Sequence, residues 1–349
     1  MRLVVSTALL LVLAAVLGEA HKPVTSKYTF NEHVLPIFRA RCAGCHVDGG
    51  AAPMSLATYA DARPWAESIR AELVAGHMPP SQAVSGAGSF VNAPLLPPRD
   101  LDIVLTWATG GTPEGRAARE PMIATRPDWP LGPPDVVLQI PREVTLRRGE
   151  MERTEEFRFA APDFSGRAIR AVDLKPGTPA IVRRATIAVA PTDQPSSTQA
   201  EDLLTLWSPD RNVVAPRNAA FAFPAGAALT ARITYRKTWK YENESLTDRS
   251  AIGVYFAAAR REILALRVSG DSLVPDDLQT IAVRPDTAAS DAEISVYAVP
   301  PNAPPQLLIR FLRQREWPER YWFDQPVALP RGTRIEASGP VVIDAVPPS

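Results

Sequence analysis

The sequence predicts a multidomain α plus β protein, in which a small all-α domain precedes an antiparallel β-sandwich region of jelly-roll type. Helical periodicity is confined to residues 23–115, and short β-rich runs between turn signals fill residues 136–349. A stretch rich in proline, glycine and charge, residues 116–135, separates the two and predicts a linker. The β region is long enough for one large domain or two jelly-roll-like subdomains.

The N-terminus, residues 1–20, has the pattern of a signal peptide. Arg2 supplies a positive charge, Leu3 to Leu17 is a run of apolar and small residues, and Gly18-Glu19-Ala20 places small residues at a cleavage site. We expect cleavage after Ala20 and a periplasmic or otherwise extracytoplasmic protein, with an uncleaved anchor as the alternative. No later apolar run approaches the roughly 20 residues of a membrane span, so none is expected in the mature chain.

The composition excludes some classes of partner. Lys and Arg total 38 and Asp and Glu total 38, with no long run of one sign, so neither nucleic acid nor an anionic membrane surface is indicated. The 36 prolines favour turns and edge strands over long helices beyond the first domain.

The motif Cys42-Ala-Gly-Cys45-His46 contains the only two cysteines of the chain. A zinc site would need further Cys or His ligands, and the other histidines are only His21, His33 and His77. A redox disulfide of the thioredoxin kind would need a strand before the motif. The residues before Cys42 instead have helical spacing, and C-x-x-C-H after a helix is the attachment pattern of a c-type haem. We therefore expect one covalent haem, with Cys42 and Cys45 as anchors and His46 as an iron ligand.

The helix before the motif and the two after it are predicted from apolar spacing and end signals. Val34, Leu35 and Phe38 share a face with Cys42, after a cap at Thr29 or Asn31. The second helix has a cap at Thr58 or Asp61, a stripe at Trp65, Ile69 and Leu73, and an end at Gly76. The third begins after Pro97-Pro98 and ends at Gly110-Gly111.

Met78 is the expected sixth ligand of the iron. It follows the end of the second helix, and Pro79-Pro80 would stiffen the loop that carries its sulfur. A thioether ligand favours the ferrous state of a haem that transfers electrons. Met54 and His77 are the alternative ligands, and an open site is the remaining alternative.

CAGCH, HMPP and the helical periodicity together resemble the class I cytochrome c fold. The order of VLPIFRARCAGCH, APMSLATYADARPWAESIR and MPP, followed by PAIVRRATIAVA, LTARITYRKTWKYENESLTDRSAIGVYFA and VALPRGTRIEASG, resembles a wider group. These are bacterial fusions of a cytochrome c domain with a module related to the copper type II, ascorbate-dependent monooxygenases, such as peptidylglycine α-hydroxylating monooxygenase. The resemblance implies a monooxygenase-like jelly roll in the β region.

The copper ligands of those enzymes are missing from this chain. Arg183 and Arg184 stand where the resemblance places a histidine pair, and Thr234 and Arg236 stand in the strand that should carry His-x-His. No histidine follows His77, and no methionine follows Met151. Copper that cycles between redox states needs imidazole or sulfur ligands, so we expect no copper. For Arg183 and Arg184, a solvated strand edge is favoured over an anion site.

The expected function is that of an exported monohaem c-type cytochrome in electron transfer, and a carrier is favoured over an enzyme. Its copper-less β region would dock it to a redox partner protein or a larger electron-transfer complex. Two alternatives remain open at this point: a haem-linked oxygenase that retains catalysis in the β region, and an open-site haem sensor or peroxidase.

Overall fold

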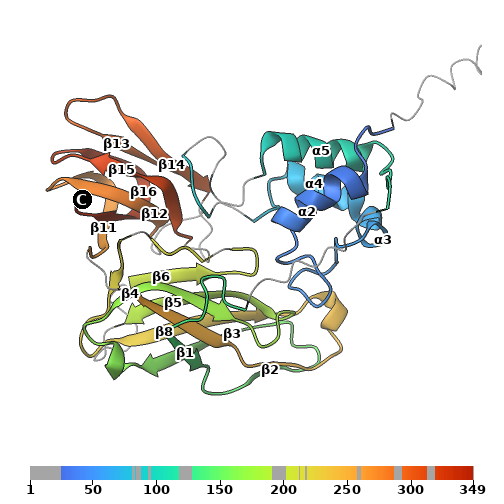
Figure 1. The fold of residues 1–349 in the computed structure, drawn as a ribbon, viewed down its shortest axis with the longest axis horizontal. Helices are drawn as coiled ribbons and strands as arrows, with labels where there is room; N and C mark the ends of the chain where they lie inside the picture. The colour runs from blue at the N-terminus through green and yellow to red at the C-terminus, as the bar shows by residue number, and fades with distance from the viewer. Residues whose placement is uncertain are drawn as a thin grey trace, which may run out of the picture.

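The structure is a computed structural model, and it describes residues 25–80, 83, 88–92, 96–117, 128–190, 202–211, 213–216, 218–257, 261–286, 293–312 and 319–348. The expected signal peptide, residues 1–20, lies outside this part of the chain. Within the described residues, no helix is both long enough and apolar enough to cross a membrane. Figure 1 shows a group of helices beside two groups of strands.

The helices of the described residues are short and lie between Phe30 and Thr109, apart from two 3₁₀ turns in the β region, Pro162–Phe164 and Trp239–Tyr241. They comprise a π-helical turn Phe30–Val34, α2 Leu35–Arg41, α3 Tyr59–Ala62, a 3₁₀ turn Arg63–Trp65, α4 Ala66–Val74 and α5 Pro98–Thr109. The hydroxyl of Thr58 accepts a hydrogen bond from the Asp61 N–H at 3.1 Å, which confirms the predicted N-cap of the second helix. Gly76, where that helix was predicted to end, has a φ of 71°, which a residue with a Cβ adopts at a cost.

The core of the helical region is aromatic. Trp107 of α5 is fully buried, with its ring centroid 5.7 Å from that of Phe30 and 6.4 Å from that of Phe38. The Trp107 Nε1–H donates to the carbonyl oxygen of Pro113 at 3.2 Å, so its polar atom is satisfied. This cluster fixes α5 against α2, the helix that leads into Cys42.

Two four-stranded antiparallel sheets form the first group of strands and share one apolar core. Their strand orders are β1-β10-β4-β7 and β3-β8-β5-β6. The strands of these sheets, and of the small pair β2-β9, are β1 Val136–Gln139, β2 Val144–Leu146, β3 Glu152–Ala160, β4 Ala168–Lys175, β5 Val182–Ala190, β6 Asp202–Trp207, β7 Phe221–Ala222, β8 Ala228–Arg236, β9 Leu246–Asp248 and β10 Ala251–Ala257. Period-two alternation along β8 places Ile233 and Tyr235 in the core.

A six-stranded sheet forms the second group, in the order β14-β13-β16-β12-β15, with β11 paired to β16. Its strands are β11 Leu264–Leu273, β12 Leu278–Pro285, β13 Glu293–Val299, β14 Gln306–Leu312, β15 Tyr321–Leu329 and β16 Arg334–Val346. The long β16 has three partners because β11 pairs along most of its length, while β13 pairs with residues 334–337 and β12 with residues 341–346. This sheet has its own apolar core, which includes Phe311 and Tyr321.

The segment between α4 and α5 joins the helical region to the second group of strands. Ala83 forms a β-bridge with Phe311, and Phe90 forms one with Phe323. The Val91 N–H also donates to the carbonyl oxygen of Trp322 at 2.9 Å. A stretch expected to lie inside a helical domain therefore hydrogen-bonds to strands more than 200 residues later in the sequence.

The predicted fold class, an N-terminal all-α cytochrome c domain followed by a β-sandwich region, is wrong. In the residues that the structure describes, strand outweighs helix, 43% against 16%, and the helices do not make up an N-terminal all-α domain. The physical reason lies in the segment with Ala83 and Phe90, whose backbone groups are satisfied by β14 and β15. Periodicity located the helices correctly, but it carries no information about where the residues between them pair.

Candidate functional site: a cavity between the helices and the first sheets

A cavity of about 890 Å³ lies between the helical region and the first group of strands. Its helical wall includes Ile37, Phe38, Ile69, Leu73 and Val104. The motif residues Cys42, Cys45 and His46 line it, as do Met54 and Met78. Its β wall carries Arg183 and Arg184 of β5, the turn Ser208–Asp210, and residues 234 and 236–239. The volume and the apolar lining are typical of a small-molecule or cofactor site.

The C-x-x-C-H motif, Cys42 to His46, lies where α2 ends and the chain turns into the cavity. The Cys42 and His46 N–H groups donate to the carbonyl oxygens of Phe38 and Cys42 at 2.8 and 2.9 Å, so the last helical turn holds the motif. The two sulfur atoms are not joined in a disulfide. Burial raises the pKa of each thiol to about 12, and the neighbouring Asp210 carboxylate contributes to the increase at Cys45. Both thiols are therefore protonated in these apolar surroundings.

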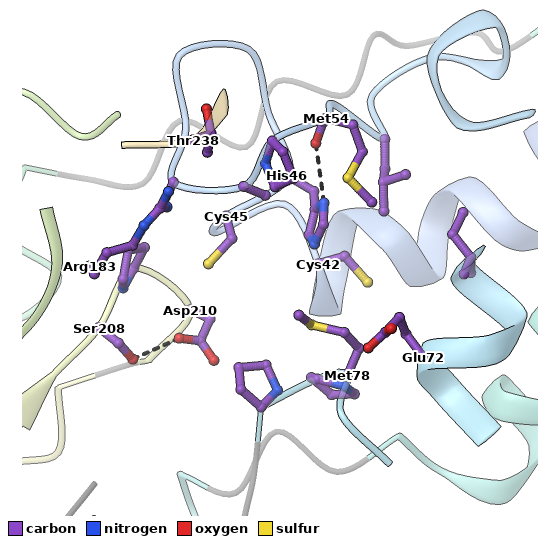
Figure 2. A pocket seen from close by; sticks show the side chains of 18 of the residues that line it. Cys42, Cys45, His46, Met54, Glu72, Met78, Arg183, Ser208, Asp210 and Thr238 are labelled. Carbon is purple, nitrogen blue, oxygen red and sulfur yellow. Dashed lines mark hydrogen bonds between the residues drawn. The ribbon is translucent and has the colours of Figure 1, made fainter. Parts of the chain in front are cut away.

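His46 is held in one orientation by the loop that follows it. Its Nδ1–H donates to the carbonyl oxygen of Met54 at 3.2 Å, as Figure 2 shows. Burial lowers the pKa of the imidazole, which favours its neutral form. A neutral histidine whose Nδ1 is occupied presents Nε2 as a lone-pair donor, the arrangement found for histidine ligands of metals.

Met78, Met54 and His77 differ in their positions around the cavity. Figure 2 places Met78 across the open space from His46, whereas Met54 lies on the His46 side. His77 is not among the lining residues, and its Nδ1 is 3.0 Å from the Glu72 carboxylate at the surface. The structure thus brings together all four residues that the sequence singled out: Cys42, Cys45, His46 and Met78.

Arg183 was missed by sequence reasoning, which favoured a solvated strand edge. β5 lies inside its sheet, between β8 and β6, and the register of its pairing shifts between Val182 and Arg184. That irregularity turns Arg183 into the cavity, as bulges near functional sites often do. Burial lowers the pKa of its guanidinium to about 10. Two adjacent arginines at the start of an apolar strand were the only signal in the sequence.

The prediction that the chain is a metal-binding cytochrome c is also wrong. The protein is mostly strand, and in the part of the chain that the structure describes no group of three or more His, Cys, Asp or Glu side chains is placed to hold a metal ion. The described side chains could therefore supply only a minority of the ligands of an iron ion in this cavity, and a cofactor would have to supply the others.

Comparisons with known proteins do not place the chain in a family. No family model matches it, and no curated protein matches it. Among solved structures, it is similar to the major capsid protein P2 of bacteriophage PM2, with 9% identity, a TM-score of 0.25, and coverage of 61% of this chain and 97% of that one. The turret protein A223 of Sulfolobus turreted icosahedral virus matches with 10% identity, a TM-score of 0.16, and coverage of 61% and 98%. Superpositions this poor support no conclusion about fold or function.

Proposed function

We propose that this chain is an exported electron-transfer protein that carries one covalently attached haem in the cavity between its helices and its first sheets. The observation that supports this most is the convergence of four residues on one cavity: two thiols, an imidazole and, across the space, a thioether. A porphyrin supplies four nitrogen ligands itself, so the protein needs to provide only the two axial ones. The lack of a protein-only metal cluster among the described residues is compatible with this arrangement.

The residues present fit such a group. Cys42 and Cys45 would hold it through thioethers to its vinyl substituents, and His46 Nε2 and Met78 Sδ would be the protein's ligands to its iron. When bound, the haem supplies a one-electron couple between ferric and ferrous iron. The chain itself would exclude water through Phe38, Ile69 and the β wall. Burial would keep His46 neutral, and the hydrogen bond to the Met54 carbonyl would orient its ring.

The β region would provide one wall of the site and a docking surface for a redox partner protein or complex. It contains no histidine and no cysteine, and Met151 is its only methionine, so this proposal includes no copper. Export is part of the proposal because haem c is attached outside the cytoplasm, and the N-terminal sequence has the pattern of a signal peptide.

The test is expression with export, followed by haem staining on a denaturing gel and metal analysis. We expect one iron per chain, no copper, and a stain that survives denaturation in the wild type but is lost in the double variant Cys42→Ala/Cys45→Ala. His77→Ala is the matched control, because this exposed histidine lies outside the cavity and its loss should leave the stain intact. Wild-type protein without haem would refute the proposal, and one or two coppers per chain would favour an oxygenase.

A further inference from the structure

A tight turn after β6 connects the two loops that carry the proposed haem ligands. The Arg211 N–H donates to the Ser208 carbonyl oxygen at 3.1 Å, and the Ser208 hydroxyl donates to Asp210 Oδ1 at 2.7 Å. Ser208, Pro209 and Asp210 line the cavity, and Arg211 is only 6% exposed. The turn, residues 208–211, therefore has a fixed shape and lies at the junction of the helical and β regions.

One side of this turn lies against the attachment motif. A Cβ atom placed on Gly44 would be 2.6 Å from the Pro209 carbonyl oxygen and 2.9 Å from the Asp210 Cα. Only glycine allows this approach, because both neighbours are backbone atoms that cannot swing away. The loop between Cys42 and Cys45 is thus seated directly on the β region.

The other side of the turn holds the loop that follows Met78. The Arg211 guanidinium donates from Nη2 to the carbonyl oxygen of Pro80 and from Nη1 to that of Asn92, the latter at 3.4 Å. The Asn92 side chain is fixed in turn, because it donates to the Arg320 carbonyl at 2.6 Å and accepts from the Trp322 N–H at 2.9 Å. Pro80 is two residues from Met78, so the position of the thioether depends on this contact.

The charge of Arg211 is balanced inside the protein. Its Nη2 is 3.0 Å from Glu319 Oε2, and its Nε is 3.7 Å from Asp210 Oδ2. The side chains of Glu319 and Asp210 are 4% and 8% exposed. Removal of one member would leave a buried charge without its partner, which is strongly unfavourable. The network therefore resists opening, and the carbonyl of Pro80 is held with it.

We infer that Arg211 is a positioning residue for Met78, the second proposed iron ligand, and that the β region thereby controls whether Met78 can reach the iron. The inference rests on the proposed function. In a variant without the Arg211 guanidinium, the haem would stay covalently attached through Cys42 and Cys45. The loop that carries Met78 would move away, and the iron would be open to an external ligand.

The test compares Arg211→Lys with Arg320→Lys in the full-length haem-loaded protein. Lysine keeps the charge but cannot span Pro80, Asn92 and Glu319 with one planar group. Arg320 is a similarly buried arginine, 4% exposed, whose Nε is 2.7 Å from Asp344 and whose other nitrogens donate to the carbonyl oxygens of Leu203 and Leu204. Its contact with Asn92 is made by its backbone carbonyl, which the substitution keeps. The readouts are the absorption band of methionine-ligated ferric haem and the affinity of the ferrous protein for carbon monoxide, with Met78→Ala as the reference for complete ligand loss.

We expect Arg211→Lys to weaken the methionine band and to raise the carbon monoxide affinity by about ten-fold, the factor that corresponds to one charge-assisted hydrogen bond. Arg320→Lys should keep both readouts at wild-type values, and both variants should retain the haem stain. An unchanged band in Arg211→Lys, or an equal loss in both variants, would overturn the inference. Wild-type protein without haem would instead refute the proposed function.

If Arg211→Lys does not fold, Glu319→Gln provides the second measurement. The amide oxygen of glutamine still accepts a hydrogen bond, but the charge that holds Arg211 is lost. We expect the methionine band to disappear on heating at a lower temperature than the loss of strand signal in circular dichroism. Simultaneous loss of both signals, as in the wild type, would contradict a positioning role.

Discussion

The two walls of the cavity have different chemistry. The helical wall provides the thiols of Cys42 and Cys45, the imidazole of His46 and the thioether of Met78, all within 37 consecutive residues. The β wall provides guanidinium and ammonium groups, hydroxyl groups and carboxylates, from strands and turns far apart in the sequence. The first wall would bond to the cofactor, whereas the second would set its electrostatic surroundings and hold the first wall in place.

This difference indicates which region determines which property. Loss of a helical-wall group should abolish haem attachment or ligation outright, because a covalent or coordinate bond has no substitute nearby. Changes on the β wall should leave the haem attached but alter its ligation and its reduction potential. The following variants test that division, from the largest expected effect to the smallest.

The largest effect is expected for Trp107→Ala in the helical core. The indole is fully buried between Phe30 and Phe38, so its truncation should cost about 3–5 kcal/mol. We expect the helical wall to lose its fixed shape and the yield of covalent haem to fall, while the strand signal in circular dichroism remains. Trp239→Ala is the control, because that side chain is 61% exposed and should change the unfolding free energy by less than roughly 0.5 kcal/mol. Full haem yield in Trp107→Ala would contradict the assignment of the helical core as the support of the site.

Gly44→Val should have the next largest effect, because it forces the attachment loop away from Pro209 and Asp210. Overpacking against backbone atoms typically costs about 1–3 kcal/mol, to be measured by chemical denaturation. The haem should stay attached, since neither thiol is altered. Ala40→Val, at an exposed position of α2, adds similar atoms without a neighbour and is the control. Equal stability of the two variants would show that the loop is not seated on the β region in solution.

The helical wall could be predicted from the sequence because the signals that specify it lie in neighbouring residues. The attachment motif, the cap at Thr58, the end at Gly76 and the position of Met78 all follow from neighbouring residues. The fold class was predicted wrongly for the opposite reason. The bridges from Ala83 and Phe90 to β14 and β15 depend on residues more than 200 positions away, and a propensity pattern does not record such pairings.

The β wall was hidden from sequence reasoning by the same limit. The direction of the Arg183 side chain depends on a shift in register between β5 and β8, which only the pairing reveals. The role of Arg211 depends on carbonyl groups of Pro80 and Asn92, and backbone acceptors have no residue-type signature. The sequence shows directly that the β region lacks histidine, but it does not show that the half-buried Arg183 lies at the cavity.

Arg183→Met should lower the reduction potential of the haem without detaching it. A half-buried positive charge beside the cavity disfavours the ferric state, which carries one more positive charge than the ferrous state. The expected change is on the order of 1 kcal/mol, or roughly 40 mV for one electron, measured by redox titration. Arg232→Met is the control, because Arg232 is exposed on β8 and does not line the cavity. Equal shifts in the two variants would show that burial does not distinguish these arginines.

The smallest effect is expected for Lys240→Gln, although Lys240 also links the two regions. Its Nζ is 2.8 Å from Asp48 Oδ1, just after the attachment motif, but the two side chains are 47% and 89% exposed. Water and salt screen such a pair, and the ordering of two flexible side chains offsets most of its attraction. We expect no measurable change in the thermal unfolding midpoint at physiological salt and at most a small decrease at low salt. A decrease in the unfolding midpoint that persists at high salt would show that Lys240 stabilises the junction by packing, because salt would have screened any contribution from its charge. If no such decrease is seen, the Gly44 contact and the Arg211 network are the interactions that hold the two regions together.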